Sequence, residues 1–393
     1  MWDAMTNSAR PLLLLSDSPS CSSGFGRITR ELATRIATDP DTASIWRVGC
    51  AGWGGTGSQH FPFPEYHFQL REEYEVWELP QIAADFAGEE PLTILAIWDA
   101  SRLGWLGNPC SIDGGCRHEG LYEWLRTKRP QKWIYHPIDA VSESSVRTDI
   151  LGGFDRVLAY TAFGAAQTGY PDHLPHGIDT SVWQPRNRDI ARTELCKSFT
   201  GLSPDSLLIG VVATNQARKD WRLTAETCRI LLERGHDVRL WAHTDAPRGW
   251  WDLPRLFNDH GMRDRAAITT FQLSDAQMTW MYSACDVTLG IGLGEGFGYP
   301  IFESLACGVP CVAVNYVGAA EFLDGKFLEN PTGYYWEGPG CAQRPTLRPD
   351  DWAVAVSTLM DKEWTGVVTL PPELDWTNLW PRWKQWLLAG ASC

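Results

Sequence analysis

Short apolar runs alternate along the chain with longer stretches in which apolar positions recur every three or four residues. The short runs are typical of buried strands in a parallel sheet, and the longer stretches are typical of amphipathic helices. Helices are predicted, among others, at 26–38, 220–234 and 376–388. Repeated strand–helix units of this kind predict an α/β protein with two doubly wound parallel sheets. The predicted strands are 11–16, 44–48, 92–98, 132–138, 155–160, 207–213, 237–242, 267–271, 286–291 and 310–314.

The length of 393 residues exceeds one typical hydrophobic core and indicates two or three domains. A polar stretch at 185–188 separates the two series of strands and predicts the domain boundary. The predicted division is therefore 1–185, 186–375 and a Trp-rich helical segment at 376–393. In doubly wound sheets, ligands bind beyond the carboxyl ends of the strands, so functional residues are expected there.

Composition narrows the classes of partner. A formal net charge of -14 disfavours a broad electrostatic grip on nucleic acid or on an anionic membrane, although a local basic patch remains compatible with it. The apolar run at 11–15 is too short to span a bilayer and no basic segment precedes it, so we expect a cytoplasmic protein without stable membrane insertion.

Cysteine usage predicts free thiols and no metal site. The eleven cysteines are odd in number and scattered, which favours reduced thiols over a disulfide framework. Cys110, Cys116 and His118 form one cluster with metal-like spacing, but it lacks a fourth ligand and matches no common zinc motif.

The most informative segment lies between the predicted strands 286–291 and 310–314. It reads EGFGYP from Glu295 and continues into a helical run that contains Glu303. A glycine-rich turn before a helix aims backbone N–H groups and the positive end of the helix dipole at an anion such as a diphosphate. The two glutamates can accept hydrogen bonds from hydroxyls at opposite ends of one ligand. A sugar nucleotide has this combination of groups.

This segment resembles the donor-site signature of the retaining glycosyltransferases of family 4, which have the GT-B fold. The resemblance implies two Rossmann-like domains that face each other across a cleft. It implies that Glu295 contacts the donor sugar and that Glu303 holds the ribose. It further implies an acceptor domain at 1–185, a donor domain at 186–375, a C-terminal helix that crosses back to the first domain, and no cofactor besides the nucleotide-sugar co-substrate. The backbone amides implied to hold sugar and phosphate are those of Gly296, Phe297, Gly298 and Tyr299.

The segment VVATNQARKDW is a candidate site for the leaving diphosphate, whose charge a fixed cation must stabilise. Lys219 matches the lysine that the family places here, but Thr214 stands where the family usually has an arginine. Arg218 would supply the missing charge, or Asn215 would donate a neutral hydrogen bond. The alternative is an Arg–Lys pair that merely ends a surface turn. Gln272 completes the donor-binding candidates of this half.

The first half of the chain offers two further motifs. Gly24 and Gly26 follow the first predicted strand and resemble the family's loop near the donor phosphates, although a tight connection alone explains them. The strand at 132–138 ends in His136, followed by Asp139. The resemblance implies that His136 touches the donor sugar and that Asp139 helps to order the acceptor, whereas a lone histidine is often structural.

The acceptor is the least determined part. Residues 101–131 form a long predicted connection that contains Trp105 and Trp124, and aromatic rings stack on sugars and on bases alike. The acceptor candidates are a saccharide, a small metabolite, a protein or a hydroxymethylated base in DNA. A nucleic-acid acceptor would use a basic run that otherwise reads as a solvated helix end, namely Arg126, Lys128 and Arg129.

The resemblance implies a metal-independent front-face displacement with retention of configuration, because retaining enzymes of this type lack an obvious nucleophile beneath the anomeric carbon. Catalysis would then depend on orientation and on charge stabilisation. The rival of another class is a non-catalytic protein that binds sugar nucleotides or carbohydrates. A sugar-nucleotide epimerase on the same fold has no positive sign in the sequence.

Overall fold

The computed structural model describes residues 9–55, 57, 59–68, 77–107, 119–142, 150–199, 201–338, 341–361 and 366–391. The chain divides into two compact units. Unit 1 comprises Met1–Ile138, Ser144–His176 and Trp380–Cys393, and unit 2 comprises Asp139–Glu143 and Gly177–Leu379. The assignment of acceptor and donor roles to 1–185 and 186–375 stays a prediction.

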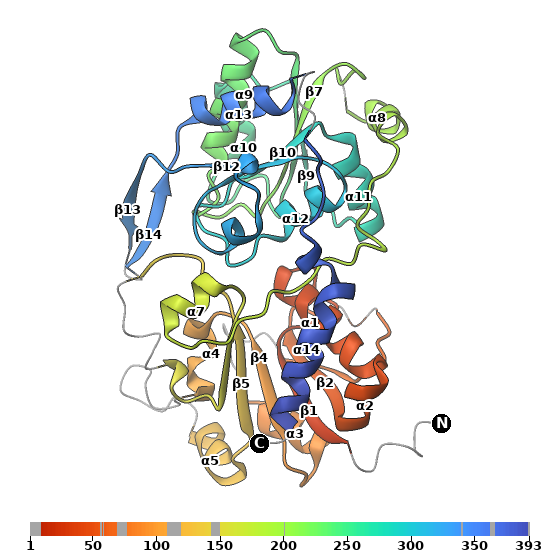
Figure 1. Cartoon of the computed structure of the whole chain (residues 1–393), viewed down its shortest axis with the longest axis vertical. Coiled ribbons are helices and arrows are strands. Elements are labelled where there is room, and N and C mark those ends of the chain that lie inside the picture. Colours follow the sequence, from red (N-terminus) through yellow and green to blue (C-terminus); the bar gives the residue numbers. More distant parts are fainter. Residues whose placement is uncertain are drawn as a thin grey trace. The chain divides into compact units, whose positions relative to one another are not determined.

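Unit 1 is built around a six-stranded parallel sheet of order β3-β2-β1-β4-β5-β6 (Figure 1). Its strands are β1 (Arg10–Asp17), β2 (Trp46–Trp53), β3 (Glu65–His67), β4 (Thr93–Ile97), β5 (Gln131–His136) and β6 (Arg156–Ala159). Its helices are α1 (Gly24–Thr38), α2 (Pro40–Ile45), α3 (Leu79–Ala87), α4 (Ala100–Gly107), α5 (Glu119–Lys128) and α7 (Ala162–Thr168).

The C-terminal helix α14 (Trp376–Ala391) belongs to unit 1 from Trp380 onward, and the predicted helix at 376–388 is present. In Figure 1 this blue helix lies beside the red N-terminal strands. Trp383 is buried and its indole N–H donates to the Pro175 carbonyl at 2.9 Å. The Arg156 guanidinium lies 3.9 Å from the centre of the Trp386 ring. Bulky apolar and cation–π contacts therefore hold the helix, even though Pro381 interrupts its hydrogen-bond ladder.

Unit 2 contains a second six-stranded parallel sheet, of order β12-β11-β10-β7-β8-β9. Its strands are β7 (Leu207–Val212), β8 (Val238–His243), β9 (Ala266–Thr269), β10 (Val287–Gly290), β11 (Cys311–Val314) and β12 (Leu328–Glu329). Its helices are α8 (Arg188–Cys196), α9 (Trp221–Glu233), α10 (Leu253–Asp259), α11 (Asp275–Ala284), α12 (Tyr299–Ala306) and α13 (Pro349–Leu359). A separate antiparallel hairpin consists of β13 (Gly333–Glu337) and β14 (Ala342–Thr346).

The ten predicted strands are all present, but the prediction for β2 was partly wrong. Residues 44 and 45 belong to α2, and the strand extends to Trp53 instead of ending at 48. Glycines inside the strand obscured it, although close packing requires them: a Cβ on Gly49 would come within 2.8 Å of the Phe86 ring. The short strand β3, the short strand β12 and the β13–β14 hairpin were missed.

Two other predictions concern the stretch 101–131 and the cysteine–histidine cluster. The stretch 101–131 is not one long connection, because α4 and α5 occupy its two ends. The Cys110, Cys116 and His118 cluster lies outside the described residues. Within the described ranges, every helix is too short or too polar to cross a bilayer.

Candidate functional site

The candidate site in unit 2 lies at the point where the strand order of its sheet reverses. Strands β7 and β10 are neighbours, with β8 and β9 on one side and β11 and β12 on the other. Connections that leave in opposite directions open a crevice at the carboxyl ends of the two strands. The loop that follows β7 carries Lys219, and the loop that follows β10 carries Glu295.

Backbone hydrogen bonds join these two loops. The N–H of Asp220 donates to the Ile291 carbonyl at 3.0 Å, and the N–H of Leu293 donates to the Arg218 carbonyl at 2.8 Å. Between them, Lys219 and Gly292 form an antiparallel bridge. This pairing fixes the backbone from which the charged side chains project.

Two cations converge on one carboxylate. The Lys219 ammonium forms an ion pair with Oε1 of Glu295, and Arg218 Nη1 lies 3.3 Å from Oε2 of the same group. Arg218 Nη1 also donates to the Gly294 carbonyl at 3.0 Å. The side chains of Lys219 and Glu295 are 9% and 16% exposed, so the pair is largely removed from water. Coulombic interactions in such surroundings are stronger than at an open surface.

The ionisation of Glu295 and of Lys219 depends on burial and on their charged neighbours. Burial acts to raise the pKa of Glu295, but Lys219 and Arg218 together outweigh it, so the pKa lies below its ordinary value. Burial lowers the pKa of Lys219; Glu295 opposes this effect and Arg218 reinforces it. An anionic ligand placed beside these cations would therefore meet a preformed positive region next to an ionised carboxylate.

A second layer of charges holds Arg218 in place. Its Nε lies 4.0 Å from a carboxylate oxygen of Asp139. Arg344, on β14, donates from Nη1 to the Asp139 carbonyl at 2.9 Å and from Nε to Glu337 at 2.7 Å. Arg344 is not evident from the sequence, because it lies 205 positions after Asp139 and in no recognisable motif. Asp139 was predicted on the acceptor side, and the structure brings it to this cluster.

The turn into α12 has the features that the sequence predicted. Gly298 adopts a left-handed conformation with φ 93°, which other residues rarely tolerate, and Pro300 occupies the first turn of the helix. No side chain caps this helix start. A Cβ on Gly298 would be 3.5 Å from the Glu295 Cβ, so the helix start lies beside the charge cluster. Phe297 is buried against Phe302, whereas Gly296 and Tyr299 complete the turn.

Glu303 projects from α12 and is buried. The hydroxyl of Tyr282, on α11, donates to its Oε2 at 2.8 Å. Burial, reinforced by Glu303, raises the pKa of Tyr282 well above its usual range, so the phenol stays a donor. Tyr282 is a second residue that sequence patterns did not reveal. It orients the carboxylate that is predicted to hold a ribose.

The other predicted residues of unit 2 lie apart from this pairing. The side-chain amide of Asn215 donates to the carbonyls of Ala246 and Trp251, at 3.0 and 2.8 Å, and its oxygen accepts from the Trp251 N–H. These contacts hold the loop after β8, so a donor contact by Asn215 remains a prediction that would require replacing them. Gln272 is exposed in the loop after β9.

In unit 1 the predicted residues are placed by packing. His136 ends β5 and is fully buried. Gly26 packs tightly, since a Cβ would come within 2.7 Å of the carbonyls of Ser18 and Cys21. Gly24 begins α1. Trp105 packs against the hydrophobic core of the unit. Their functional roles stay predictions, and the geometry of Gly26 and Trp105 is explained by structure alone.

The basic run lies near the amino-terminal end of β5, whereas His136 lies at the carboxyl end of the same strand. Arg126 and Lys128 are on α5, which ends immediately before β5 begins, whereas His136 is the last residue of that strand. Arg126 pairs with Glu123 at 2.7 Å and Lys128 pairs with Glu89 at 2.6 Å. Arg129 follows with φ 47°. Because ligands bind at carboxyl ends of strands, this placement disfavours the predicted acceptor role of the run.

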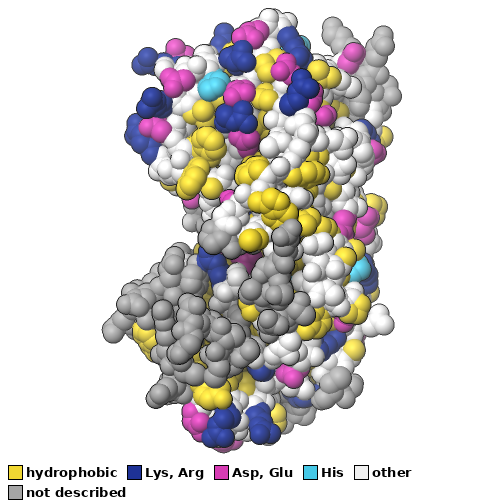
Figure 2. All heavy atoms as spheres, turned by 90° about the vertical axis from the view of Figure 1, so that its left-hand side faces the viewer, with side chains coloured by type: hydrophobic (Ala, Val, Ile, Leu, Met, Phe, Trp, Pro, Cys, Tyr) yellow, Lys and Arg dark blue, Asp and Glu magenta, His cyan; other side chains and the backbone are white. Residues whose placement is uncertain are grey.

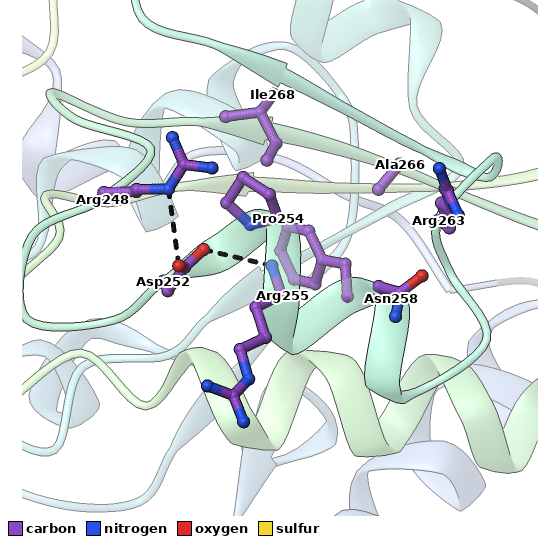
Figure 3. Close-up of a pocket in the computed structure, with 9 residues that line it drawn as sticks. Arg248, Asp252, Pro254, Arg255, Asn258, Arg263, Ala266 and Ile268 are labelled. Atoms are coloured by element: carbon purple, nitrogen blue, oxygen red, sulfur yellow. Dashed lines mark hydrogen bonds and ion pairs between the residues drawn. The ribbon is translucent and has the colours of Figure 1, made fainter.

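A groove elsewhere in unit 2 has a volume of about 510 Å³ but contains none of the predicted residues. It runs between α10 and the edge strand β9 (Figure 3). The Arg248 side chain points to Asp252 within it, at 3.4 Å. Cavity size therefore does not locate the candidate site, and the convergence of charges at the switch point does. Among the described residues, no group of three or more His, Cys, Asp or Glu side chains is arranged to hold a metal ion.

Comparison with known proteins finds similarity in the part of the chain that contains this cluster. The family described as Glycosyl transferases group 1 matches residues 204–362. The D-inositol 3-phosphate glycosyltransferases of Mycobacteroides abscessus and Actinosynnema mirum are 26% and 27% identical over 201 and 194 residues. These matches cover 50% and 47% of this chain, and 40% and 42% of the relatives. The chain thus spans about two fifths of the length of the curated relatives it matches.

Solved structures extend the similarity to the whole chain. The Anabaena protein Alr3699/HepE in complex with UDP and glucose has a TM-score of 0.70 at 15% identity, covering 97% of this chain and 100% of its own. Sucrose-phosphate synthase from Thermosynechococcus elongatus has a TM-score of 0.68 at 18% identity, with 97% and 100% coverage. These similarities confirm the predicted GT-B fold.

Proposed function

We propose that this chain transfers a sugar from a nucleoside diphosphate sugar to an acceptor hydroxyl, with retention of configuration. The observation that carries the proposal is the meeting of Lys219, Arg218 and Glu295 where the sheet of unit 2 reverses and α12 begins. Cations and a helix start suit a diphosphate, and the carboxylate suits sugar hydroxyls.

The proposed donor is a UDP-sugar. Similar solved structures from Anabaena and E. coli hold UDP, UDP-glucose or UDP-2-fluoro glucose. In this chain, the diphosphate would lie against Lys219, Arg218 and the backbone amides of 296–299. Glu303, oriented by Tyr282, would accept hydrogen bonds from the ribose hydroxyls. These assignments use groups whose positions are fixed by the fold.

Donor binding would redistribute the charges of the site. Glu295 is ion-paired with both Lys219 and Arg218. A diphosphate competes for those cations, which leaves Glu295 able to accept hydrogen bonds from the donor sugar. The anomeric C–O bond to the phosphate then breaks, the acceptor oxygen bonds to the same face, and the departing phosphate oxygen takes the acceptor proton. Preorganised cations stabilise the charge that develops on that oxygen.

The proposed acceptor is a saccharide or another small compound with a hydroxyl group. The alternative, a hydroxymethylated base in DNA, relied on the basic run to bind phosphates. Two members of that run are ion-paired with Glu123 and Glu89, so a polyanion would have to compete with these carboxylates for the positive charge. A saccharide needs no such charge.

Incubation with a panel of nucleotide sugars tests the proposal. We expect slow hydrolysis of one UDP-sugar in the absence of acceptor, with NMR showing that the released sugar first has the anomeric configuration of the donor. Nucleotide binding without hydrolysis or transfer to any acceptor would favour the rival function, a non-catalytic binding protein. Hydrolysis with inverted configuration would contradict the proposed mechanism.

A further inference from the structure

The β13–β14 hairpin presents three consecutive exposed aromatic side chains. Tyr334, Tyr335 and Trp336 are 52%, 43% and 49% exposed. Side chains alternate between the two faces of a strand, so Tyr335 lies on one face and its two neighbours lie on the other. Single exposed aromatics need no explanation, so the case for Tyr335 depends on what lies next to it on its own face of the hairpin.

The face that carries Tyr335 is continuous with the candidate donor site. Arg344 is directly opposite Tyr335 in the hairpin register. The guanidinium of Arg344 binds Asp139 and Glu337, and a Cβ on Gly294 would come within 2.5 Å of its Nη1. Gly294 immediately precedes Glu295. Arg344 therefore pairs with Tyr335 across the hairpin and also lies beside the residue that precedes Glu295.

Electrostatics support this proximity. Burial, followed by the nearby Glu337, raises the pKa of Tyr335, and Asp220 adds to the effect across the loop after β7. Asp220 adjoins Lys219 and caps the start of α9. The Tyr335 hydroxyl therefore interacts electrostatically with charged residues near the site, while the residue is 43% exposed.

The charge of the hairpin identifies the kind of ligand. Its charged residues in the two strands are Glu337 and Arg344, which pair with each other, so the hairpin offers no excess positive charge. Figure 2 shows the side on which the hairpin lies, with hydrophobic side chains gathered in one area of unit 2 and most Lys and Arg side chains in another. Nucleic-acid strands require cations for their phosphates, whereas a sugar ring requires an aromatic face and polar neighbours.

We propose that Tyr335 is a stacking platform for a sugar ring of a saccharide acceptor, next to the Glu295 cluster. Glu337, on the same face and partly exposed, can accept hydrogen bonds from that ring's hydroxyls. This inference rests on the proposed function and makes it more specific: the acceptor class is carbohydrate, and unit 2 contributes to its binding.

The test uses the full-length protein with UDP bound and an immobilised panel of mono- and oligosaccharides, with single-stranded DNA as a further probe. We expect the wild type to retain at least one saccharide. Tyr335→Ala should weaken that binding about tenfold, since a stacked ring is lost, and Tyr335→Phe should stay within about twofold. Trp336→Ala is the matched control, because it removes an equally exposed ring from the opposite face of the same strand.

Hydrolysis of the UDP-sugar without acceptor is measured in parallel and should be unchanged in all three variants. If the wild type hydrolyses no UDP-sugar, the proposed function is overturned, but the proposal that Tyr335 binds a saccharide is not. Several results would overturn the platform: no saccharide retained by the wild type, unchanged binding by Tyr335→Ala, or an equal loss in Trp336→Ala. Retention of DNA in place of saccharide would overturn the assigned ligand class.

Discussion

The sheets of the two units have the same topology but different chemistry at equivalent positions. When strands are numbered within each unit, both sheets have the order 3-2-1-4-5-6, so each reverses between its first and fourth strands. These points are β1 and β4 in unit 1, and β7 and β10 in unit 2. Topology alone would therefore allow a ligand at either one.

Aromatic rings occupy this region in unit 1. Trp98 directly follows β4, and its ring lies 4.8 Å from Trp53 and 5.6 Å from Phe25. Trp53 and Trp98 are 5% and 6% exposed. The Ser16 hydroxyl donates to the Ile97 carbonyl at 2.7 Å, which ties the two strand ends together. The corresponding position in unit 2 has ion-paired loops and an uncapped helix start. Strand order thus supplies the position, and side chains decide whether it binds an anion.

The largest expected effect comes from removing the buried cation of unit 2. Lys219→Ala should lower kcat for donor turnover about 10²–10³-fold, equivalent to roughly 3–4 kcal/mol, because one preorganised charge is lost from the transition state. Steady-state kinetics with the best UDP-sugar provide the measurement. Lys128→Ala is the control, since that lysine is ion-paired on the surface of unit 1. Equal turnover in Lys219→Ala and the wild type would remove Lys219 from catalysis.

Glu303→Ala should weaken UDP binding by about 1.5–3 kcal/mol, because the ribose loses a charged acceptor. Calorimetry measures the affinity directly. Tyr282→Phe keeps the carboxylate but removes its orienting hydroxyl, so a smaller loss is expected. Glu65→Ala removes the carboxylate that Ser20 binds in unit 1 and should leave UDP affinity unchanged. If Glu65→Ala and Glu303→Ala weaken binding equally, the contrast between the units fails.

Arg218→Ala should lower turnover about tenfold, less than Lys219→Ala, because Arg218 is more exposed and shares its charge with Asp139. Thr214→Arg in the same protein should partly restore the rate, because it adds a cation to the loop that carries Lys219. Thr214 is exposed at the carboxyl end of β7, so the longer side chain can be accommodated. An Arg218→Ala variant with unchanged turnover would contradict the hypothesis that Arg218 supplies the charge missing at Thr214.

The smallest effect concerns a charge of unit 1 that stabilises the fold. Burial acts to raise the pKa of Asp39, but hydrogen bonds from Lys384 and Trp380 of α14 outweigh it and lower the pKa to about 2. A lowered pKa means that the ionised group stabilises the native state. Its contribution is present above about pH 4 and is lost as the pH falls towards 2, amounting to no more than about 1 kcal/mol after solvent screening.

Urea unfolding at pH 5 and pH 2.5 measures this contribution. Asp39→Asn should be less stable than the wild type at pH 5 and nearly equal to it at pH 2.5, with UDP affinity at neutral pH unchanged. A pH-independent difference between the two proteins would show that the ionised form of Asp39 is not what stabilises α14.

Local rules explain what could be predicted. The helix expected at 220–234 is α9, with Asp220 as its N-cap and Arg234 as its C-cap, because a side-chain acceptor at a helix start is a local signal. The turn before α12 was equally predictable, since Gly298 and Pro300 have backbone preferences that do not depend on distant partners. The strand β2 was harder to predict, because its glycines are required by close packing against residues on other elements.

The sequence by itself determined the alternation of strands and helices, the turn before α12 and the candidate roles of Lys219 and Glu295. Only the tertiary structure decided that Arg344 and Asp139, 205 positions apart, support Arg218, and that the amide of Asn215 is used to hold a loop. It also separated the basic run from the carboxyl end of β5. Backbone preferences act over a few residues, whereas charge pairing acts between side chains that only the folded chain brings together.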